Sequence, residues 1–389
     1  MELVNPLSAF RWWPDYLDVA GVKMRGIAEK QGHAFSRLGW LSVRDGASDA
    51  DEIGRAIRRQ YRPLSQLALD KARNEYASRE VIRFPRYFII EPLTVCNRKC
   101  FFCPIIVTNR YGAKMKWEHF TKLMEECGQH DVYGLSLYQL SEPMLYRGRD
   151  EESNPVDIAD MVDVAKRKGG FKAVNISTNG DVTNLDRLLE CDLDDLFFSI
   201  DGTTAEVYSQ NRPSTKANDI GAFERTVGRV HAFLELKASR GQARPWCRLQ
   251  IINNSLCAPQ VLDFIRYWIQ IPGVDDVFVK HLDSMAPWLG TSVVPEEEAR
   301  IKMDKVRTMP CQHIYSIGSM VATGSYNACS HDALTQLTTA DARVDKMSFA
   351  DWWNGDFMTK LRTEHEEGAS RMPCVACAER DPWLGGLAP

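Results

Sequence analysis

Six short apolar segments recur along the chain from residue 87 onward, and each has the length of a buried β-strand. These segments are Tyr87–Leu93, Tyr133–Leu140, Ala173–Ser177, Asp195–Ile200, Trp246–Ile252 and Asp276–Leu282. Between them lie segments with the apolar spacing of amphipathic helices, namely Lys116–Cys127, Val156–Lys168, Asn184–Cys191, Ile220–Ala238 and Pro259–Ile269. Strands that alternate with helices predict βαβ units and a parallel sheet. Six units are too few to close an eight-stranded barrel, so we expect an α/β fold with a partial (β/α)6 barrel and a site at the carboxyl ends of its strands.

The same pattern divides the chain into three regions. Residues 1–84 include a charged amphipathic run from Glu52 to Glu80, and we expect a mostly helical N-terminal extension there. Residues 85–288 carry the alternating pattern and are predicted to form the partial barrel. Residues 289–389 have short elements and loops, and we expect a separate C-terminal domain.

Charge and composition narrow the class of protein. The 389 residues carry a net charge of −4, so the basic excess typical of nucleic-acid binding is missing. No stretch of about 18 apolar residues is present, and the N-terminus lacks the apolar core of a secretory signal. We therefore expect a cytoplasmic protein. Disulfides are rare in a reducing compartment, so the eleven cysteines favour metal binding or catalysis.

Three cysteines follow the first predicted strand with the spacing C-x3-C-x2-C: Cys96, Cys100 and Cys103. Four-iron clusters normally take four cysteine ligands, so three would leave one iron open to a substrate or cofactor. The alternative is a zinc site completed by a distant residue. Structural zinc sites usually present C-x2-C pairs, and this spacing therefore favours an iron–sulfur cluster.

This spacing resembles the signature of the radical S-adenosylmethionine superfamily, including the aromatic Phe102 before the third cysteine. The resemblance implies a radical-SAM partial barrel and a [4Fe-4S] cluster whose open iron is chelated by the amino and carboxylate groups of S-adenosylmethionine. One electron from a flavodoxin- or ferredoxin-type donor would cleave the sulfonium and release a 5′-deoxyadenosyl radical. That radical would abstract a hydrogen atom from the substrate, while the protein orients the cofactor.

The resemblance also implies cofactor contacts at later strand ends. Glu142 stands in Ser141-Glu142-Pro143, where the family typically has Gly-Glu-Pro, and would pair with the ammonium group of the cofactor. Arg212 would meet the methionyl carboxylate. The remaining expected contacts come from small polar stretches and are Ser177, Asn179 and Ser199, the last for a ribose hydroxyl.

A second cysteine group lies near the C-terminus and comprises Cys311, Cys329, Cys374 and Cys377. With Gly324 five positions before Cys329, it resembles the auxiliary-cluster region of the same superfamily, in the abbreviated twitch form of the SPASM-like domain. The resemblance implies one fully ligated auxiliary [4Fe-4S] cluster with an electron-transfer or structural role. A zinc site with four cysteine ligands is the alternative.

The twitch resemblance suggests two reactions, both at a carbinol carbon. A dehydrogenase would oxidise it and an epimerase would invert it, in a hydroxylated sugar or aminocyclitol-like intermediate of natural-product biosynthesis, including antibiotic biosynthesis. Inversion needs a hydrogen-atom donor, and Cys257 is the lone cysteine placed in a loop at the catalytic mouth. His281 or Asp283 could deprotonate the hydroxyl of the substrate radical. Arg248, Gln250, Asn253 and Lys280 are candidate substrate contacts, of which alternation allows only half to point inward.

Two other functions stay open. One is radical modification of a ribosomally made peptide, with residues 1–84 binding its leader. The other is a zinc-stapled binding protein without enzymatic activity.

Overall fold

The computed structural model describes residues 83–281, 310–374 and 377, with a few short pieces before residue 83. One such piece pairs β1 (Asp18–Val19) with β2 (Val22–Lys23) in antiparallel fashion. The predicted helical extension at residues 1–84 lies almost entirely outside the described residues. Across the described part of the chain, no helix is both long enough and apolar enough to span a membrane.

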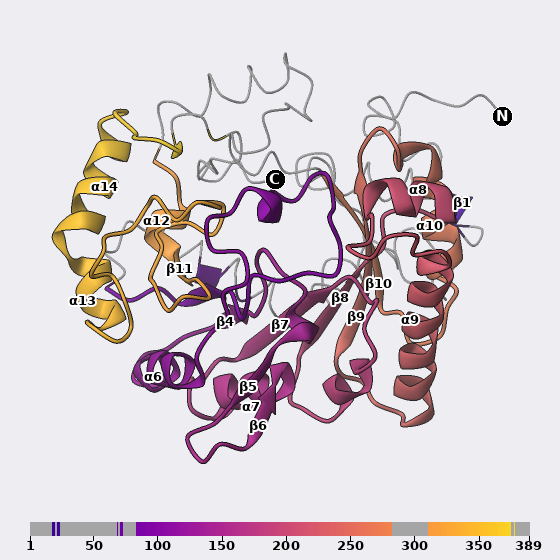
Figure 1. Cartoon of the computed structure of the whole chain (residues 1–389), viewed down its shortest axis with the longest axis horizontal. Coiled ribbons are helices and arrows are strands. Elements are labelled where there is room, and N and C mark those ends of the chain that lie inside the picture. The colour runs from indigo at the N-terminus through magenta and orange to yellow at the C-terminus, as the bar shows by residue number, and fades with distance from the viewer. Residues whose placement is uncertain are drawn as a thin grey trace.

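Seven parallel strands form the central sheet in the order β10-β9-β8-β7-β4-β3-β11 (Figure 1). Their bounds are β3 (Tyr87–Ile90), β4 (Gly134–Ser136), β7 (Ala173–Thr178), β8 (Asp195–Ser199), β9 (Trp246–Asn253), β10 (Asp276–His281) and β11 (Ile317–Met320). All six predicted strands are present, and the predicted α/β partial-barrel fold is confirmed. Because every neighbouring pair is parallel, all the carboxyl ends meet at one edge of the sheet.

Helices connect the strands and cover the sheet. The α-helices are α6 (Trp117–Cys127), α7 (Ile158–Arg167), α8 (Ala205–Asn211), α9 (Ala222–Ser239), α10 (Val261–Trp268), α12 (His313–Ser316), α13 (Phe349–Asn354) and α14 (Asp356–Glu366). The 3-10 helices are η1 (Pro104–Ile106), η2 (Pro143–Leu145), η3 (Leu185–Leu189) and η4 (Ala258–Gln260), and β5 (Arg147–Arg149) pairs with β6 (Pro155–Asp157) in a hairpin. Figure 1 shows α9 and α10 at the β10 end of the sheet and α13 and α14 at the opposite end.

Local sequence explains where these elements start and how they pack. Asp157 caps α7 by accepting from the backbone N–H of Ala159, and Asp160 completes a capping box. Strand β8 is buried along its whole length, as expected for a central strand covered on both faces. The segment Asn184–Cys191, predicted as a helix, forms only the short 3-10 helix η3.

The strand β11 was not predicted, and it joins the C-terminal region to the barrel sheet. It pairs with β3 in parallel register, Ile317 opposite Tyr87. A Cβ atom at Gly318 would lie 2.5 Å from Cε1 of Phe88, so only glycine allows this approach. Glu126 adds a second link, because its two carboxylate oxygens accept from the backbone N–H groups of Phe349 and Ala350 at the start of α13, each at 2.8 Å.

A buried ion pair reinforces this junction. Glu91, directly after β3, is fully buried and binds the guanidinium of Arg110 at 2.8 and 3.1 Å through two nitrogens. The same carboxylate accepts from the backbone N–H groups of Leu140 at 3.4 Å and Ala322 at 3.1 Å. Three chain segments far apart in sequence therefore meet at one carboxylate.

We expect Arg110→Met to destabilise the protein by about 3–5 kcal/mol, because Glu91 would then be a buried carboxylate without its cation. Chemical unfolding of the full chain measures the loss. The control is Arg167→Ala, whose exposed guanidinium lies 3.8 Å from Asp163 and should change the unfolding free energy by at most about 0.5 kcal/mol. Equal, small losses in both variants would contradict this role of the pair, and adding Glu91→Leu to Arg110→Met should recover part of the loss.

Candidate active site

A cavity of about 360 Å³ opens at the carboxyl edge of the sheet. The predicted site residues that line it are Cys96, Cys100, Cys103, Glu142, Ser177, Asn179, Ser199 and Arg212. They come from the loop after β3, the segment after β4, the carboxyl ends of β7 and β8 and, for Arg212, the end of α8. Residues far apart in sequence thus converge at the place where parallel α/β sheets bind their ligands.

The cysteine loop brings three thiols to this cavity. Burial raises the pKa of the Cys103 thiol to about 12, and the neighbouring Cys100 adds to the effect. Burial also raises the pKa of Cys96, followed by the charge of Glu142. Buried thiols of this kind become thiolates only when a cation compensates the charge, which is what metal coordination does. The donor set therefore fits a metal centre.

The spacing of the thiols distinguishes between kinds of metal centre. Tetrahedral zinc with bonds of about 2.3 Å holds its sulfur ligands about 3.8 Å apart. In the described part of the chain, the one group of three or more Cys, His, Asp or Glu ligand atoms lying within 4.8 Å of one another is His313, Cys329 and His331. The three loop thiols are more widely spread than that, which fits a cluster of several irons better than one zinc ion.

A buried arginine holds the cysteine loop in place. Arg98 forms an ion pair with Asp181 after β7, and both side chains are almost completely buried. Asp181 also pairs with Arg225 at 2.9 Å and Arg229 at 2.5 Å, both on α9. Neither Arg98 nor Asp181 was predicted as a site residue. The sequence places Arg98 inside the cysteine motif, but nothing in it indicates the partner on the far side of the loop.

Glu142 lies at the end of the segment after β4, and its carboxylate faces the cavity. It accepts hydrogen bonds at 2.7 Å from the hydroxyl of Thr178 and the backbone N–H of Asn179, and one at 3.2 Å from the backbone N–H of Met144. Burial raises its pKa from 4.5 to about 7, against these donors, which lower it. A cationic ligand in the cavity would restore the ionised form, so this position suits an ammonium group.

Three polar side chains form a row across adjacent strands. The hydroxyls of Ser177 and Ser199 lie 3.3 Å apart, and the amide of Gln250 donates to both. Ser199 stands opposite Gln250 in the parallel register of β8 and β9. This row gives the cavity a hydrogen-bonding wall suited to hydroxyl groups.

A carboxylate fixes the position of the Arg212 guanidinium. Its Nε donates to Asp201 at 2.6 Å, and its Nη1 lies 3.7 Å from the sulfur of Cys100. Burial has the largest single effect and lowers the pKa of Arg212, but Asp201, Cys100 and Tyr208 together outweigh burial, so the pKa is raised. Arg212 therefore stays cationic beside the cysteine loop.

The strands β9 and β10 show which of their polar residues face the cavity. Arg248, Gln250 and Lys280 line it, whereas Asn253 is not among the lining residues. For these four positions the structure thus shows which residues line the cavity, a point that the sequence pattern could not decide.

Of the three predicted catalytic residues, the structure describes the side chain of Cys257 alone. Cys257 is fully buried, accepts from the side-chain amide of Asn211 at 3.2 Å and is not among the lining residues. His281 ends β10, and its side chain lies outside the described residues, as does all of Asp283. Their catalytic roles stay predictions.

The second cysteine group also converges. Burial raises the pKa of the Cys329 thiol, and the next causes are its neighbours Cys311, Cys377 and Cys374. The segment after Cys329 lies against the first site, because Ala333 packs with Ile105 and Leu140, and Cys96 and Cys103 pack on that cluster. The backbone oxygen of Ser330 accepts from the cavity residue Gln139. The residues that follow Cys329 therefore contact the first site directly, and the two cysteine groups are neighbours.

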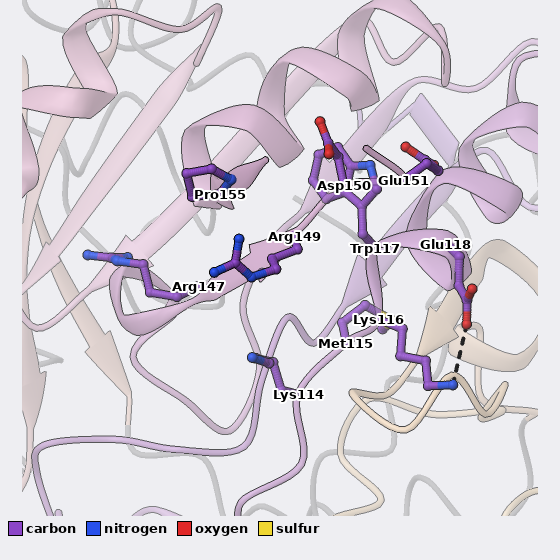
Figure 2. Close-up of a pocket in the computed structure, with 11 residues that line it drawn as sticks. Lys114, Met115, Lys116, Trp117, Glu118, Arg147, Arg149, Asp150, Glu151 and Pro155 are labelled. Carbon is purple, nitrogen blue, oxygen red and sulfur yellow. Dashed lines mark hydrogen bonds and ion pairs between the residues drawn. The ribbon is translucent and has the colours of Figure 1, made fainter. Parts of the chain in front are cut away.

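A larger cavity, of about 680 Å³, lies between the start of α6 and the β5–β6 hairpin. Figure 2 shows its charged rim, where Lys116 and Glu118 form an ion pair at 3.3 Å. Both partners are mostly exposed, and no cysteine or histidine lines this cavity. The smaller cavity has the buried, convergent polar groups that active sites require.

We predict that Glu142 makes protein stability depend on pH. Its folded pKa of about 7 exceeds the ordinary value of 4.5, so its stabilising contribution is complete below about pH 4.5 and is lost as the pH rises through 7. The loss corresponds to roughly 3 kcal/mol. Unfolding free energies of the metal-free chain between pH 4.5 and 8 should show this decline, and Glu142→Gln should remove it. Glu118→Gln, at an exposed position, should keep the wild-type profile; parallel profiles for all three proteins would contradict the assignment.

Comparison with known proteins gives matches in structure. No family model matches the chain, and no curated protein matches it in sequence. SuiB of Streptococcus suis bound to precursor peptide SuiA superposes with a TM-score of 0.51 at 12% identity, covering 86% of this chain and 76% of SuiB. Native anSMEcpe with bound AdoMet gives 0.49 at 14% identity, covering 75% and 88%. BtrN in complex with AdoMet and 2-DOIA gives 0.46 at 16% identity, covering 76% and 92%.

These proteins are radical S-adenosylmethionine enzymes with auxiliary clusters. At such low identity the likeness to SuiB concerns the fold alone. The chain therefore has the fold of the radical S-adenosylmethionine superfamily, as its cysteine motif predicted.

Proposed function

We propose that this protein is a radical S-adenosylmethionine enzyme that carries a [4Fe-4S] cluster on Cys96, Cys100 and Cys103. The observation that carries the proposal is the convergence of these three thiols and the buried carboxylate of Glu142 on one cavity. The three cysteines would hold three irons and leave the fourth for the cofactor. When bound, the cluster supplies the electron that cleaves S-adenosylmethionine, and the radical so formed takes a hydrogen atom from a substrate carbon.

The residues of the chain hold the cofactor and keep it oriented. Glu142 binds the ammonium group, and its pKa near 7 means that binding favours the ionised carboxylate. Arg212 faces the methionyl carboxylate while Asp201 fixes its guanidinium. Ser199 and Ser177 offer hydroxyls to the ribose, held in place by Gln250.

The second group, Cys311, Cys329, Cys374 and Cys377, would hold the auxiliary [4Fe-4S] cluster. Its convergence around Cys329 supports this assignment, as does the packing of the following segment against residues of the cavity. Four ligands close a cluster completely, which suits electron transfer rather than substrate binding. An electron donor of the flavodoxin or ferredoxin type would reduce the first cluster.

The substrate that we propose is a polar, hydroxylated small molecule of the sugar or aminocyclitol class. The cavity wall supports it, because Gln250, Arg248 and Lys280 offer hydrogen bonds to hydroxyl groups. The volume of about 360 Å³ is at the low end of the range for small-ligand sites. A peptide substrate is the second candidate, since the SuiB structure contains a precursor peptide, although a shared fold does not fix the substrate.

Metal analysis of the anaerobically reconstituted protein tests the class of enzyme. We expect about eight irons per chain for two four-iron clusters, and 5′-deoxyadenosine on reduction with S-adenosylmethionine. Cys100→Ala should keep about four irons and lose 5′-deoxyadenosine formation. Cys191→Ala is the control, because its half-buried thiol lies near the backbone oxygen of Leu188 and outside both groups. Zinc without iron would instead support the zinc-stapled binding protein.

Aminocyclitols, sugars and peptides tested in parallel identify the substrate class.

The fate of the substrate radical that we propose is oxidation to a carbonyl. Inversion needs a hydrogen-atom donor in contact with the substrate, and the full burial of Cys257 away from the cavity favours oxidation. We expect Cys257→Ala to leave the carbonyl product and its rate of formation within about threefold of wild type, since the buried thiol does not line the cavity. Product analysis by mass spectrometry and solvent-deuterium incorporation measures this. An inverted product whose formation stops in Cys257→Ala would identify Cys257 as the donor and contradict the oxidation proposal.

A further inference from the structure

Two histidines accompany the second cysteine group, each two positions after a cysteine. The sequence reads Cys311-Gln312-His313 and Cys329-Ser330-His331. An auxiliary cluster held by four cysteines uses neither histidine. The repeated Cys-x-His spacing nevertheless places one imidazole close in sequence to each of two thiols.

The geometry brings three of these side chains together. The ligand atoms of His313, Cys329 and His331 all lie within 4.8 Å of one another. The sulfur of Cys329 is 3.9 Å from Nδ1 of His331, and the two imidazole rings stand 5.3 Å apart with an interplanar angle of 71°. Such a steep angle lets two rings direct nitrogens to a common point instead of stacking.

The surrounding fold supports this arrangement. His313 is the first residue of α12 and is 7% exposed. The backbone N–H of His331 donates to the sulfur of Cys329 at 3.4 Å, which fixes the turn between them. The side chain of Gln139 holds the intervening Ser330 through its backbone oxygen.

The separation of Cys329 and His331 is close to that expected for ligands of a single tetrahedral ion. Metal–nitrogen and metal–sulfur bonds of about 2.0 and 2.3 Å at a tetrahedral angle separate the two ligand atoms by about 3.5 Å. The distance of 3.9 Å between Cys329 and His331 is within a few tenths of an ångström of that value. Two imidazoles and one thiolate suit zinc and the neighbouring divalent transition metals, and a water molecule would complete the set.

We propose that His313, Cys329 and His331 form a mononuclear site for a divalent transition-metal ion, Zn²⁺ above all, which competes with the auxiliary cluster for Cys329. Binding replaces the thiol proton of Cys329 by the metal, and that proton passes to solvent. A chain that takes up Zn²⁺ here cannot close a cluster on Cys311, Cys329, Cys374 and Cys377. The site stands independently of the radical chemistry at the other cysteine group.

A cobalt titration of a full-length variant isolates the site. In Cys100→Ala, Cys103→Ala, Cys311→Ser, Cys374→Ser, Cys377→Ser the auxiliary cluster loses three ligands, the cysteine loop keeps a single thiol, and the His–Cys–His group is kept. We expect one equivalent of Co²⁺ to bind with tetrahedral visible bands and a charge-transfer band of one thiolate, and Zn²⁺ to displace it. Adding His313→Gln and His331→Gln should weaken binding at least about 100-fold, because changes outside the ligand shell already cost 10–100-fold. Adding His231→Gln, on α9 and hydrogen-bonded to Tyr267, should not; binding that survives loss of both histidines overturns the proposal.

A second measurement keeps all four auxiliary cysteines and so does not depend on the folding of the serine variant. In the Cys100→Ala chain, one equivalent of Zn²⁺ added before reconstitution should suppress the remaining four irons. With His313→Gln and His331→Gln also present, the iron content should be kept in spite of zinc. Equal suppression in both chains overturns the proposal, and so does a loss of iron in the histidine variant without zinc, which would make the histidines cluster ligands. If no iron enters either chain, the radical-enzyme proposal fails while the cobalt titration still decides this one.

Discussion

The buried ion pair of Glu91 and Arg110 is the interaction on which the site depends. Glu91 ends the strand that leads into the cysteine loop, and its oxygens also bind the backbone of Leu140, in the loop after β4, and of Ala322, after β11. Arg110 closes the far end of that loop and donates to Thr335 and the backbone oxygen of Ala333. A buried carboxylate with this many donors tolerates only one arrangement of its surroundings, so the pair specifies the relative positions of loop, sheet and C-terminal segment.

The consequence for the site is that its charges are arranged in pairs before any ligand binds. Arg98 is neutralised by Asp181, and Arg212 by Asp201. Glu142 differs, because its donors are hydroxyl and backbone N–H groups and burial keeps its pKa near 7. The arginine pairs therefore hold the loop in shape, while Glu142 is the group whose charge a cationic ligand would change.

The features that could be predicted from the sequence have one thing in common: each follows from residues that are close together along the chain. The six strands showed as apolar runs, and the cavity-lining positions Glu142, Ser177 and Ser199 lie at or shortly after strand ends, which parallel topology brings to one edge. The missed features depend on partners distant in sequence. Strand β11 has four residues and no strong alternation, and its place is set by Phe88 packing over Gly318. Arg98 and Glu91 were not predicted as important residues, because nothing local in the sequence indicates their partners Asp181 and Arg110. Cys257 was placed in the correct loop, yet its side chain turns into the core.

Burial of the cysteines has a consequence that concerns the whole chain. Thiols at Cys96, Cys103 and Cys329 have pKa values raised first by burial and then by neighbouring negative charges, so the metal-free protein keeps them protonated. Metal uptake must expel these protons, which makes metal affinity rise with pH. The same burial lets thiols pack as small apolar groups before metal arrives, as Cys96 and Cys103 do against Ile105 and Leu140. The fold can therefore assemble around both cysteine groups in advance, and metal then replaces protons within a structure that the Glu91–Arg110 pair already holds.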